Sequence, residues 1–556
     1  MINAYSISAI LVCLLIFHKV LPSKKDNGFT VTLSDKASWI LFIVLFSISI
    51  ILRFIYINET PGIINQDSAM AAVNAKSIMQ TGCDIDGVRF PMHFNAWNFS
   101  QMNALPSYLL IPFFYLGGMN MFTLFLCIFL YSITGMLFVF LFTKKAFGNT
   151  VAISFMLFCL SNPWHFMQSR WFLEASFFAH FFAIGVYLLY IGFIDHKKWC
   201  IYLAIIVFAI SHYTYGVSLY TVPLLLITLY IIGFKKKYIS GKTFILSVLL
   251  YLFISLPFYL MIFINMFGLS SINYFGITIP FFPNSVRAQD IVFFTEHPIK
   301  QFAKNIGYLL STMLSIQFET IWTTIPNIGT LMLFTIPLYL TGLFLSIKKM
   351  KNTFDMKYVF IFAWLGVSII NGCITNKSNS NRINIIMYPL MILMAIGSYY
   401  IINNSKFRFI SLFLIYLVCS SAFLRTYYTE YDSYLQNADY TFTGKFYDAL
   451  NKAKELNSTY YVITPDSQHK NAFEVTEVYT RFVFDIDSDY ANGDTLSSES
   501  LSYNEKYCYR NITDDDILHP QKDITYLVDS NHISMFDANE WTIYDYYPFY
   551  VCRIKN

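Results

Sequence analysis

Long apolar runs recur along most of the chain, and short polar segments separate them. Runs of about 20 apolar residues are long enough to cross a bilayer as helices, so this pattern predicts a polytopic α-helical membrane protein. The segment 105–118 is apolar but short, and is expected at the membrane interface or as a half-helix. The twelve predicted spans are residues 3–20, 38–57, 121–143, 149–163, 171–194, 198–213, 217–234, 243–266, 328–347, 357–374, 383–402 and 407–425.

Lysine clusters in alternate connections orient the predicted bundle. Basic residues concentrate in the cytoplasmic connections of membrane proteins, so we place these connections inside. The others, including 58–106 and 267–327, then face outward, as does everything after about residue 426. The sequence therefore predicts a multi-pass plasma-membrane protein. The clusters are Lys24 and Lys25, Lys144 and Lys145, Lys197 and Lys198, Lys235 to Lys237, Lys348 with Lys349 and Lys351, and Lys406 with Arg408.

Composition agrees with this class. The chain of 556 residues is 56% hydrophobic and only 13% charged, whereas soluble domains carry about 25% charged residues. No nucleotide-binding glycine motif is visible, which disfavours a nucleotide-driven pump, and no nucleic-acid partner is expected. The nine cysteines show no metal-type spacing. Cys508 and Cys552 share the C-terminal region, and their pairing stays open.

The C-terminal part has a different character. From Thr426 onward it carries 22 acidic and 10 basic residues with few apolar runs. We expect two domains: a transmembrane catalytic domain over 1–425 and a soluble, extracytoplasmic α/β domain over 426–556. The acidity either reflects a solvated surface, which is the more common case, or has a functional role. Its predicted elements are a helix at 446–454 and strands at 460–464, 524–528 and 549–552.

Asp67 is the strongest candidate for the chemical centre. It opens a predicted helix at 66–80 in the outer loop 58–106, where Ala71, Ala72, Ala75 and Ile78 form an apolar face. A carboxylate at this position either caps the helix amides or has a functional role, because acids at the mouth of a span are costly. The same loop carries Arg89 and His93.

A second group of candidates lies at 161–174. Arg170 and Glu174 are four residues apart, so we expect them on one helix face, either as a local ion pair or as functional groups near apolar depth. His165 is open to three roles: an interfacial side chain, a phosphate contact or a metal ligand.

Two further outer turns carry candidate groups. Tyr213 and Tyr215 belong to an interface belt of aromatic residues or to a substrate site. Arg382, just before a span, either extends to lipid headgroups or binds a lipid phosphate, which a guanidinium fork fits well. Acids, arginines and histidines on one side of the membrane suit a substrate with a phosphate head and an apolar tail.

These residues resemble motifs of the polyprenyl-phosphate-sugar-dependent glycosyltransferases of the GT-C class, in particular the protein O-mannosyltransferase and aminoarabinose transferase group (glycosyltransferase family 39). Many members have a second acid after the loop acid, where this chain has Ser68. The C-terminal domain is similar only in placement. The matching residues are Arg53, Pro61, Gly62 and Asp67; Pro163, Trp164, His165, Ser169, Arg170 and Glu174; Tyr213 to Gly216 with Pro223; and Asn381 and Arg382 with Pro389.

The resemblance implies transfer of a sugar from a polyprenyl-phosphate donor to a lipid, glycan or protein acceptor on the outer face, with inversion at the anomeric carbon. Asp67 would act as the base, and Glu174 would orient an arginine, the acceptor or a metal. His165, Tyr213 and Tyr215 would contact substrate. The residues expected to bind the donor phosphate are Arg170, Arg382, Arg89 and His93.

Other interpretations stay open. No cofactor is certain, but a divalent metal held by Asp67, Glu174 and His165 is compatible with the class. A lipid-linked oligosaccharide ligase or polymerase would use a similar substrate. A transporter or flippase would explain the spans, although no repeat-related halves are visible.

Overall fold

The computed structural model divides into two compact units, which we describe separately. Unit 1 contains Met1–Ile57, Ile128–Tyr259 and Val286–Tyr431, and unit 2 contains Asn58–Cys127, Leu260–Ser285 and Asp432–Asn556. The structure describes residues 4–20, 30–96, 100–274, 276–282, 291–316, 320–376, 378–437, 444–464, 472–488, 501–503 and 506–555.

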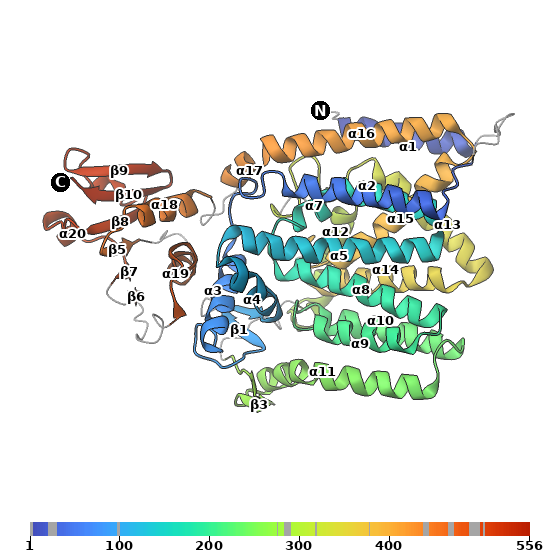
Figure 1. Ribbon diagram of the computed structural model, residues 1–556, viewed down its shortest axis with the longest axis horizontal. Coiled ribbons are helices and arrows are strands. Elements are labelled where there is room, and N and C mark those ends of the chain that lie inside the picture. Colours follow the sequence, from blue (N-terminus) through green and yellow to red (C-terminus); the bar gives the residue numbers. More distant parts are fainter. Residues whose placement is uncertain are drawn as a thin grey trace. The chain divides into compact units, whose positions relative to one another are not determined.

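Unit 1 is helical (Figure 1). Its helices are α1 (Ala4–Val20), α2 (Asp35–Phe54), α5 (Met121–Phe147), α6 (Asn149–Ser161), α7 (Pro163–Gln168), α8 (Glu174–Ile194), α9 (Lys198–Ser211), α10 (Ser218–Lys235), α11 (Gly241–Phe267), η2 (Val292–Phe294), α12 (Pro298–Met313), α13 (Thr335–Thr353), α14 (Met356–Ile374), η3 (Asn384–Ile386), α15 (Met387–Ile402) and α16 (Lys406–Thr429). Of these, α5 starts and α11 ends in unit 2.

The structure confirms the predicted class of polytopic helical membrane protein. Each of the twelve predicted spans corresponds to a described helix, with bounds shifted by a few residues in most cases. Within the described part of the chain, eight helices are long and apolar enough to cross a membrane, and four more apolar helices are shorter. The eight are α2, α5, α8, α10, α11, α14, α15 with η3, and α16. The short segment expected at the interface is α4 (Leu105–Gly117).

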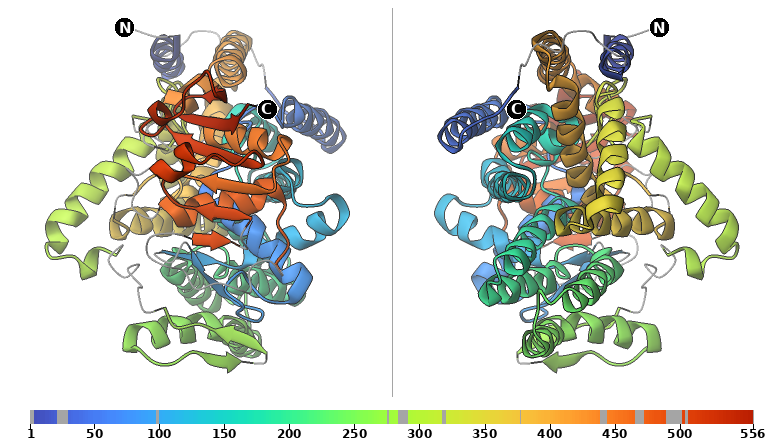
Figure 2. Two further views of the ribbon diagram at one scale, coloured as in Figure 1. Left: turned by 90° about the vertical axis from the view of Figure 1, so that its left-hand side faces the viewer. Right: turned by 90° about the vertical axis from the view of Figure 1, so that its right-hand side faces the viewer.

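Glycines let α13 and α15 pack backbone to backbone. A Cβ on Gly342 would overlap the carbonyl oxygen of Leu393, and one on Gly397 would overlap that of Leu338. Small residues at such crossings are typical of helix pairs in membranes. The α15 helix also packs on α6, and α6 on α2. The first and last helices of the bundle, α1 and α16, lie side by side (Figure 2).

One predicted span begins later than expected. The segment from 328 to 334 forms turns, and α13 starts only at Thr335. Gly329 adopts a φ of 75°, and the hydroxyl of Ser315 binds the backbone of Leu331 through both its N–H and its carbonyl. These local bonds replace the helical hydrogen bonds, which an apolar pattern alone does not reveal.

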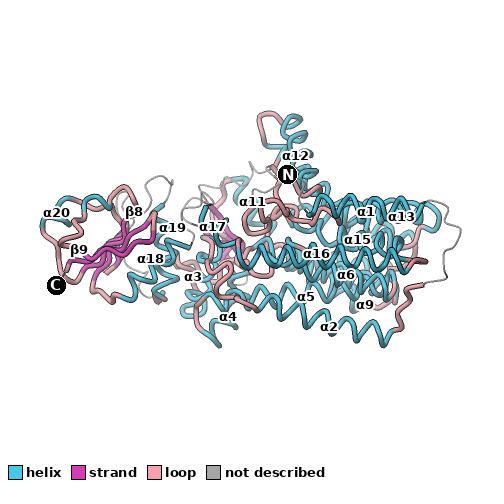
Figure 3. The backbone as a smooth tube through the Cα atoms, turned by 90° about the horizontal axis from the view of Figure 1, so that it is seen from above, coloured by secondary structure: helices cyan, strands magenta, loops and turns pink. Residues whose placement is uncertain are grey.

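The sequence did not predict α12, an amphipathic helix in the connection 267–327. Asn305 and Leu309 are buried, and Asn305 donates to the carbonyl of Cys373 in α14 over 2.9 Å. On another face, Ile299 and Phe302 are exposed. In Figure 3, α12 leaves the side of the helical bundle across the direction of α16. Polar residues alternate with the apolar stripe of α12, so the helix lacks the continuous apolar run by which spans are identified.

Unit 2 combines the loop 58–106 and the residues that follow it with the C-terminal region. The sequence predicts three strands in the C-terminal part, at 460–464, 524–528 and 549–552, and the structure confirms all three. It also confirms the helix predicted at 446–454. The elements are α3 (Gln66–Thr81), β1 (His93–Ala96), β2 (Ser100–Asn103), α4, β3 (Ile272–Tyr274), β4 (Ile277–Ile279), α17 (Tyr431–Asn437), α18 (Gly444–Glu455), β5 (Tyr460–Ile463), α19 (Ala472–Phe484), β6 (Leu501–Tyr503), β7 (Tyr507–Tyr509), α20 (Asp514–Leu518), β8 (Ile524–Asp529), η5 (Ile533–Met535), β9 (Trp541–Tyr546) and β10 (Phe549–Ile554).

The C-terminal strands form one six-stranded mixed sheet in the order β6-β7-β5-β8-β10-β9. The β5 strand is parallel to β7 and β8, and the outer pairs are antiparallel. One core contains Val462, Tyr526, Val528 and Trp541, and α18 packs against β8 and β10. Cys508 and Cys552 are free thiols. The α/β class expected for this region is confirmed.

Candidate functional site

Asp67 lies in the first turn of α3, and Asn65 caps this helix. The Asn65 side chain accepts hydrogen bonds from the N–H and the hydroxyl of Ser68 over 2.8 and 2.7 Å. The alternative in which Asp67 is the N-cap is therefore wrong, because the capping position lies two residues earlier. Asp67 is half-buried, and its carboxylate lies in the turn where the helix dipole favours negative charge.

The sequence of α3 explains why this helix forms and where it ends. Ala71, Ala72 and Ala75 are buried, as expected from their spacing. Gly82 ends the helix in the left-handed region with a φ of 75°, and its N–H donates to the carbonyl of Ile78 over 2.8 Å. This C-terminal geometry favours glycine. The Asn65 side chain thus defines the start of the helix that carries Asp67, and the backbone conformation of Gly82 defines its end.

Arg89 and His93 occupy different environments. Arg89 is exposed, and its carbonyl accepts a hydrogen bond from the Thr278 hydroxyl over 2.8 Å. His93 lies on β1 and is buried, with its ring against the edge of Phe282 at a centroid distance of 5.7 Å. The exposed guanidinium of Arg89 is available to an anionic ligand, whereas the His93 ring is buried and contacts Phe282.

Asp84, in the same loop, is a titratable group that sequence reasoning missed. Its Oδ1 accepts the N–H groups of Asp86 and Val88 over 3.0 and 2.8 Å. Burial raises the pKa of Asp84 from an ordinary value of 3.8 to about 7. The two backbone bonds oppose this shift but do not cancel it. The signal available in the sequence was the turn Asp84 to Gly87, in which an aspartate commonly binds backbone amides.

Arg53 is the buried polar centre of unit 1. Its guanidinium is fully buried and donates to the carbonyls of Cys159 and Leu160 at the end of α6 over 3.1 and 3.2 Å. It also binds the hydroxyls of Ser49 and Ser169. These bonds satisfy a charge that would be costly at this depth. The arginine that carries the family resemblance therefore joins α2, α6 and the end of α7.

A chain of hydrogen bonds runs from Arg53 through two histidines. Arg53 Nη2 lies 3.0 Å from His165 Nδ1, His165 Nε2 lies 3.1 Å from the Tyr388 hydroxyl, and that hydroxyl lies 2.9 Å from His180 Nδ1. A guanidinium only donates, so His165 accepts at Nδ1 and donates from Nε2, and Tyr388 donates to His180. Both ring nitrogens of His165 are thus engaged, which favours a structural role.

Arg170 and Glu174 do not share a helix, contrary to the expectation from their spacing. Arg170 lies in the turn after α7, and Glu174 is the first residue of α8. The buried Arg170 donates to the carbonyls of Ile55 and Tyr56 beyond the end of α2 over 3.0 and 2.8 Å. The spacing failed as a guide because α7 ends at Gln168 and the chain turns before α8 begins.

Arg382 lies in a loop that is tied to the start of α8. The Asn379 side chain accepts the N–H groups of Asn381 and Arg382 over 3.1 and 3.0 Å, which shapes the turn. Asn381 accepts a bond from Gln168 of α7 over 3.0 Å. Asn384 donates to the carbonyl of Ala175, next to Glu174. The structure thus brings the segments of Glu174 and Arg382 together through amide residues, of which the sequence analysis named Asn381.

The half-buried Arg382 guanidinium donates through Nη1 to the carbonyl of Asn376 over 2.5 Å.

Tyr213 and Tyr215 are also half-buried, and the Tyr213 hydroxyl donates to the carbonyl of Ile254 in α11 over 2.6 Å. His180 and Tyr388, which belong to the hydrogen-bond chain that starts at Arg53, were not identified from the sequence. A histidine inside an apolar span was the signal that could have found His180.

Possible metal ligands are dispersed. Among the residues that the structure describes, no group of three or more histidine, cysteine, aspartate or glutamate side chains is arranged to hold a metal ion. Of the three residues that the sequence left open for a metal, Glu174 and His165 belong to unit 1 and Asp67 belongs to unit 2.

Comparison with known proteins identifies the fold. No protein-family model and no curated protein sequence matches the chain. The structure of ArnT from Cupriavidus metallidurans bound to undecaprenyl phosphate is similar, with a TM-score of 0.54 and 11% identity over 93% of this chain and 98% of ArnT. The apo structure of ArnT gives a TM-score of 0.53 over the same shares.

An archaeal oligosaccharyltransferase, AglB from Archaeoglobus fulgidus, solved with an inhibitory peptide and a dolichol-phosphate, is also similar. Its TM-score is 0.50 and its identity is 12% over 80% of this chain, but the match covers only 63% of AglB. At such low identities the likeness establishes fold and not activity. The helical arrangement, together with the nearly complete overlap with ArnT, shows that this chain has the GT-C fold.

Proposed function

We propose that this protein is a membrane glycosyltransferase that moves a sugar from a polyprenyl-phosphate donor to an acceptor. The observation that carries this proposal is the likeness to ArnT, because it covers nearly all of both chains and includes a complex with undecaprenyl phosphate. Because the match covers 93% of this chain, it extends into the C-terminal region as well as the helical part. A lipid-phosphate substrate also agrees with a membrane fold that carries arginines outside its spans.

Asp67 is the proposed base. The acceptor hydroxyl oxygen forms a bond to the anomeric carbon while the bond from that carbon to the phosphate oxygen breaks. The acceptor proton passes to the Asp67 carboxylate, and polyprenyl phosphate leaves. One such displacement inverts the anomeric centre. Asn65 caps the helix, so Asp67 is not required as a cap, and this supports a functional role for its carboxylate.

Arg382 is the proposed binding residue for the donor phosphate, since its half-buried guanidinium lies in a turn shaped by Asn379. A guanidinium presents paired N–H groups that match phosphate oxygens. Arg89 and His93 are further candidates, of which the exposed Arg89 fits the role better. We assign Arg170 to holding the end of α2, because phosphate binding would compete with its two carbonyl bonds.

Glu174, at the start of α8, would orient the acceptor or an arginine.

We further propose that the plasma membrane is the site of action and that the first outer loop and the C-terminal region face outward. The support for this orientation is the phase of the lysine clusters, which fall in alternate connections.

A donor panel tests the function. Purified protein in lipid nanodiscs is incubated with radiolabelled undecaprenyl-phosphate sugars of different sugar type, with and without membrane-lipid acceptors. Release or transfer of label that depends on the protein is the expected result. Failure with every donor, together with donor-independent solute flux in proteoliposomes, would instead favour a transporter.

A further inference from the structure

The C-terminal helix α19 packs along α3, the helix that carries Asp67. Both helices belong to unit 2. Val475, Val478 and Phe482 on α19 are buried. On α3, Ala72 and Ala75 are fully buried, and such small side chains allow a neighbouring helix to approach closely. The apolar contact explains why the two helices associate, but it does not determine how α3 is rotated.

A buried hydrogen bond holds the start of α3. The Tyr479 hydroxyl of α19 donates to the carbonyl of Ile64 over 2.9 Å, and both residues are buried. Ile64 immediately precedes the cap residue Asn65 and lies three positions before Asp67. A carbonyl just before a helix start has no partner in that helix, so the tyrosine supplies one. The bond links the C-terminal region directly to the turn that contains Asp67.

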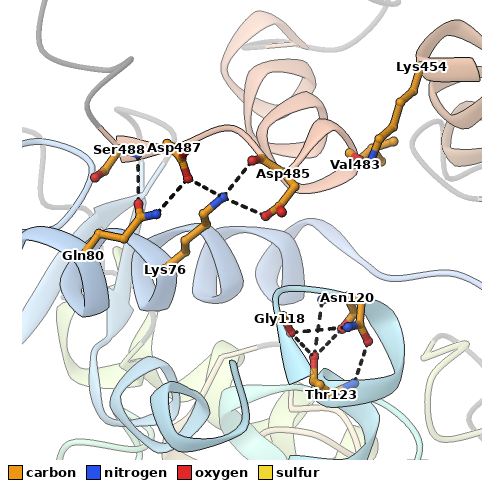
Figure 4. Close-up of polar contacts among 10 residues, drawn as sticks. All are labelled: Lys76, Gln80, Gly118, Asn120, Thr123, Lys454, Val483, Asp485, Asp487 and Ser488. Carbon is orange, nitrogen blue, oxygen red and sulfur yellow. Dashed lines mark hydrogen bonds and ion pairs between the residues drawn. The ribbon is translucent and has the colours of Figure 1, made fainter. Parts of the chain in front are cut away.

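An ionic clamp holds the other half of α3 (Figure 4). Lys76 Nζ lies 2.7 Å from both the carbonyl and Oδ1 of Asp485, and 2.9 Å from Oδ1 of Asp487. One turn further, the amide of Gln80 donates to Asp487 over 2.7 Å and accepts from the N–H of Ser488 over 3.1 Å. The clamp therefore joins two successive turns of α3 to the segment that follows α19.

The chemistry of Lys76 shows that this contact is specific. Its side chain is only 9% exposed, whereas those of Asp485 and Asp487 are 55% and 64% exposed. A buried lysine is unfavourable unless it is paired. Here it lies at the carboxyl end of α19, where a helix dipole favours a cation. Lys454 of α18 binds the same helix end through the carbonyl of Val483 over 2.7 Å (Figure 4).

From these contacts we infer that the C-terminal domain positions the proposed base. Tyr479 at one end, and the ionic clamp at the other, fix both the rotation and the translation of α3. A base must be held within about 0.5 Å of its productive position, and one packed face alone permits rotation. Tyr479, Lys76 and Gln80 are thus positioning residues that act through Asp67. This inference rests on the proposed role of Asp67 in sugar transfer.

The test compares Lys76→Met with Lys76→Arg in full-length protein in nanodiscs. Methionine keeps the length of the stem but removes the ammonium group, so the Asp485 carbonyl and the two exposed carboxylates lose this partner. We expect Lys76→Met to lower kcat by roughly 10- to 100-fold, the scale of a small misplacement, with little change in the donor KM. Lys76→Arg, which keeps the charge, is expected to restore most of kcat. The substrate is the radiolabelled undecaprenyl-phosphate sugar of the donor panel that turns over fastest.

Amide hydrogen exchange over residues 66–81 provides a readout that is independent of activity, and it is expected to rise in Lys76→Met. The matched control is Lys452→Met, which removes a lysine of α18 that pairs with the exposed Glu455. If Lys76→Met does not fold, Asp485→Asn combined with Asp487→Asn weakens the clamp from its exposed side. Either variant should give the same pattern.

An unchanged kcat in the clamp variants overturns the inference, whatever the exchange shows. If Asp67→Asn is inactive while the clamp variants turn over normally, the proposed function stands and only the positioning role fails. If Asp67→Asn itself turns over normally, the assignment of the base fails, and the positioning role fails with it.

Discussion

The guanidinium of Arg53 donates a hydrogen bond to Nδ1 of His165 across 3.0 Å, and this one contact determines the proton positions of the buried chain that continues to Tyr388 and His180. The same guanidinium binds two carbonyls at the end of α6. A residue near the end of a predicted span is thus a junction of several helices. Its contribution is expected to be mainly to stability.

Arg53→Lys is expected to destabilise the protein by about 3 kcal/mol or more, because a lysine cannot reach all the acceptors and leaves buried polar groups unsatisfied. Thermal unfolding in detergent measures the loss. Arg425→Lys is the control, since Arg425 is exposed on α16 and such changes usually stay within about 0.5 kcal/mol. Equal melting temperatures for the two variants would contradict the assignment.

Asp67→Asn is expected to abolish sugar transfer without loss of folding. Loss of a general base typically costs about 10²- to 10⁴-fold in rate, whereas the helix keeps its cap because Asn65 supplies it. Turnover of the panel donor and the melting temperature are measured together. Asp86→Asn, the same change at an exposed position of the same loop, should retain activity. Near-normal turnover of Asp67→Asn would remove it as the base.

Arg382→Lys is expected to weaken donor binding. The turn should persist, because Asn379 binds backbone N–H groups that the substitution keeps. A lysine cannot form the paired contacts of a guanidinium, so we expect the donor KM to rise by roughly tenfold, which corresponds to about 1.4 kcal/mol. Initial-rate kinetics against donor concentration measure this change. A donor KM equal to that of the parent protein would argue against a phosphate contact.

Asp84→Asn should stabilise the protein at high pH only. The folded pKa of Asp84 is about 7, above the value of about 3.9 in an unfolded chain. The contribution of Asp84 to the free energy of unfolding is therefore fully present below about pH 4 and is lost as the pH rises through about 7. The variant keeps the acceptor of the two backbone bonds, so its advantage above pH 7 is at most about 4 kcal/mol.

Melting temperatures of Asp84→Asn and parent protein at about pH 4 and about pH 8 measure this effect. They should coincide at the lower pH and separate at the higher one. Asp537→Asn is the control, because Asp537 is exposed but accepts a similar backbone bond, from Asn539 over 2.9 Å. A difference of equal size at both pH values would rule out titration of Asp84 as the cause.

Much of the architecture was predictable from local pattern. Apolar runs located the twelve predicted helices of the bundle, and the spacing of Ala71, Ala72 and Ala75 located α3. Short runs of aromatic and β-branched residues located β5, β8 and β10. These elements follow from sequence because burial of a continuous apolar stretch or face favours one local conformation whatever its partner. The predicted start of α13 was less accurate. The Ser315 hydroxyl binds the backbone of Leu331 and holds this segment outside the helix, and such a bond leaves the hydropathy pattern unchanged.

The candidate site depended on contacts that local pattern does not encode. Spacing placed Arg170 and Glu174 on one helix, but a turn separates them. The sequence separated Lys76 from Asp485 by 409 positions, and only folding placed them in one clamp. Local preferences thus determined which segments are helices and strands, while the tertiary structure decided the partner of each buried charge. The reason is physical: a charge removed from water requires a partner wherever packing provides one, and packing is a property of the whole fold.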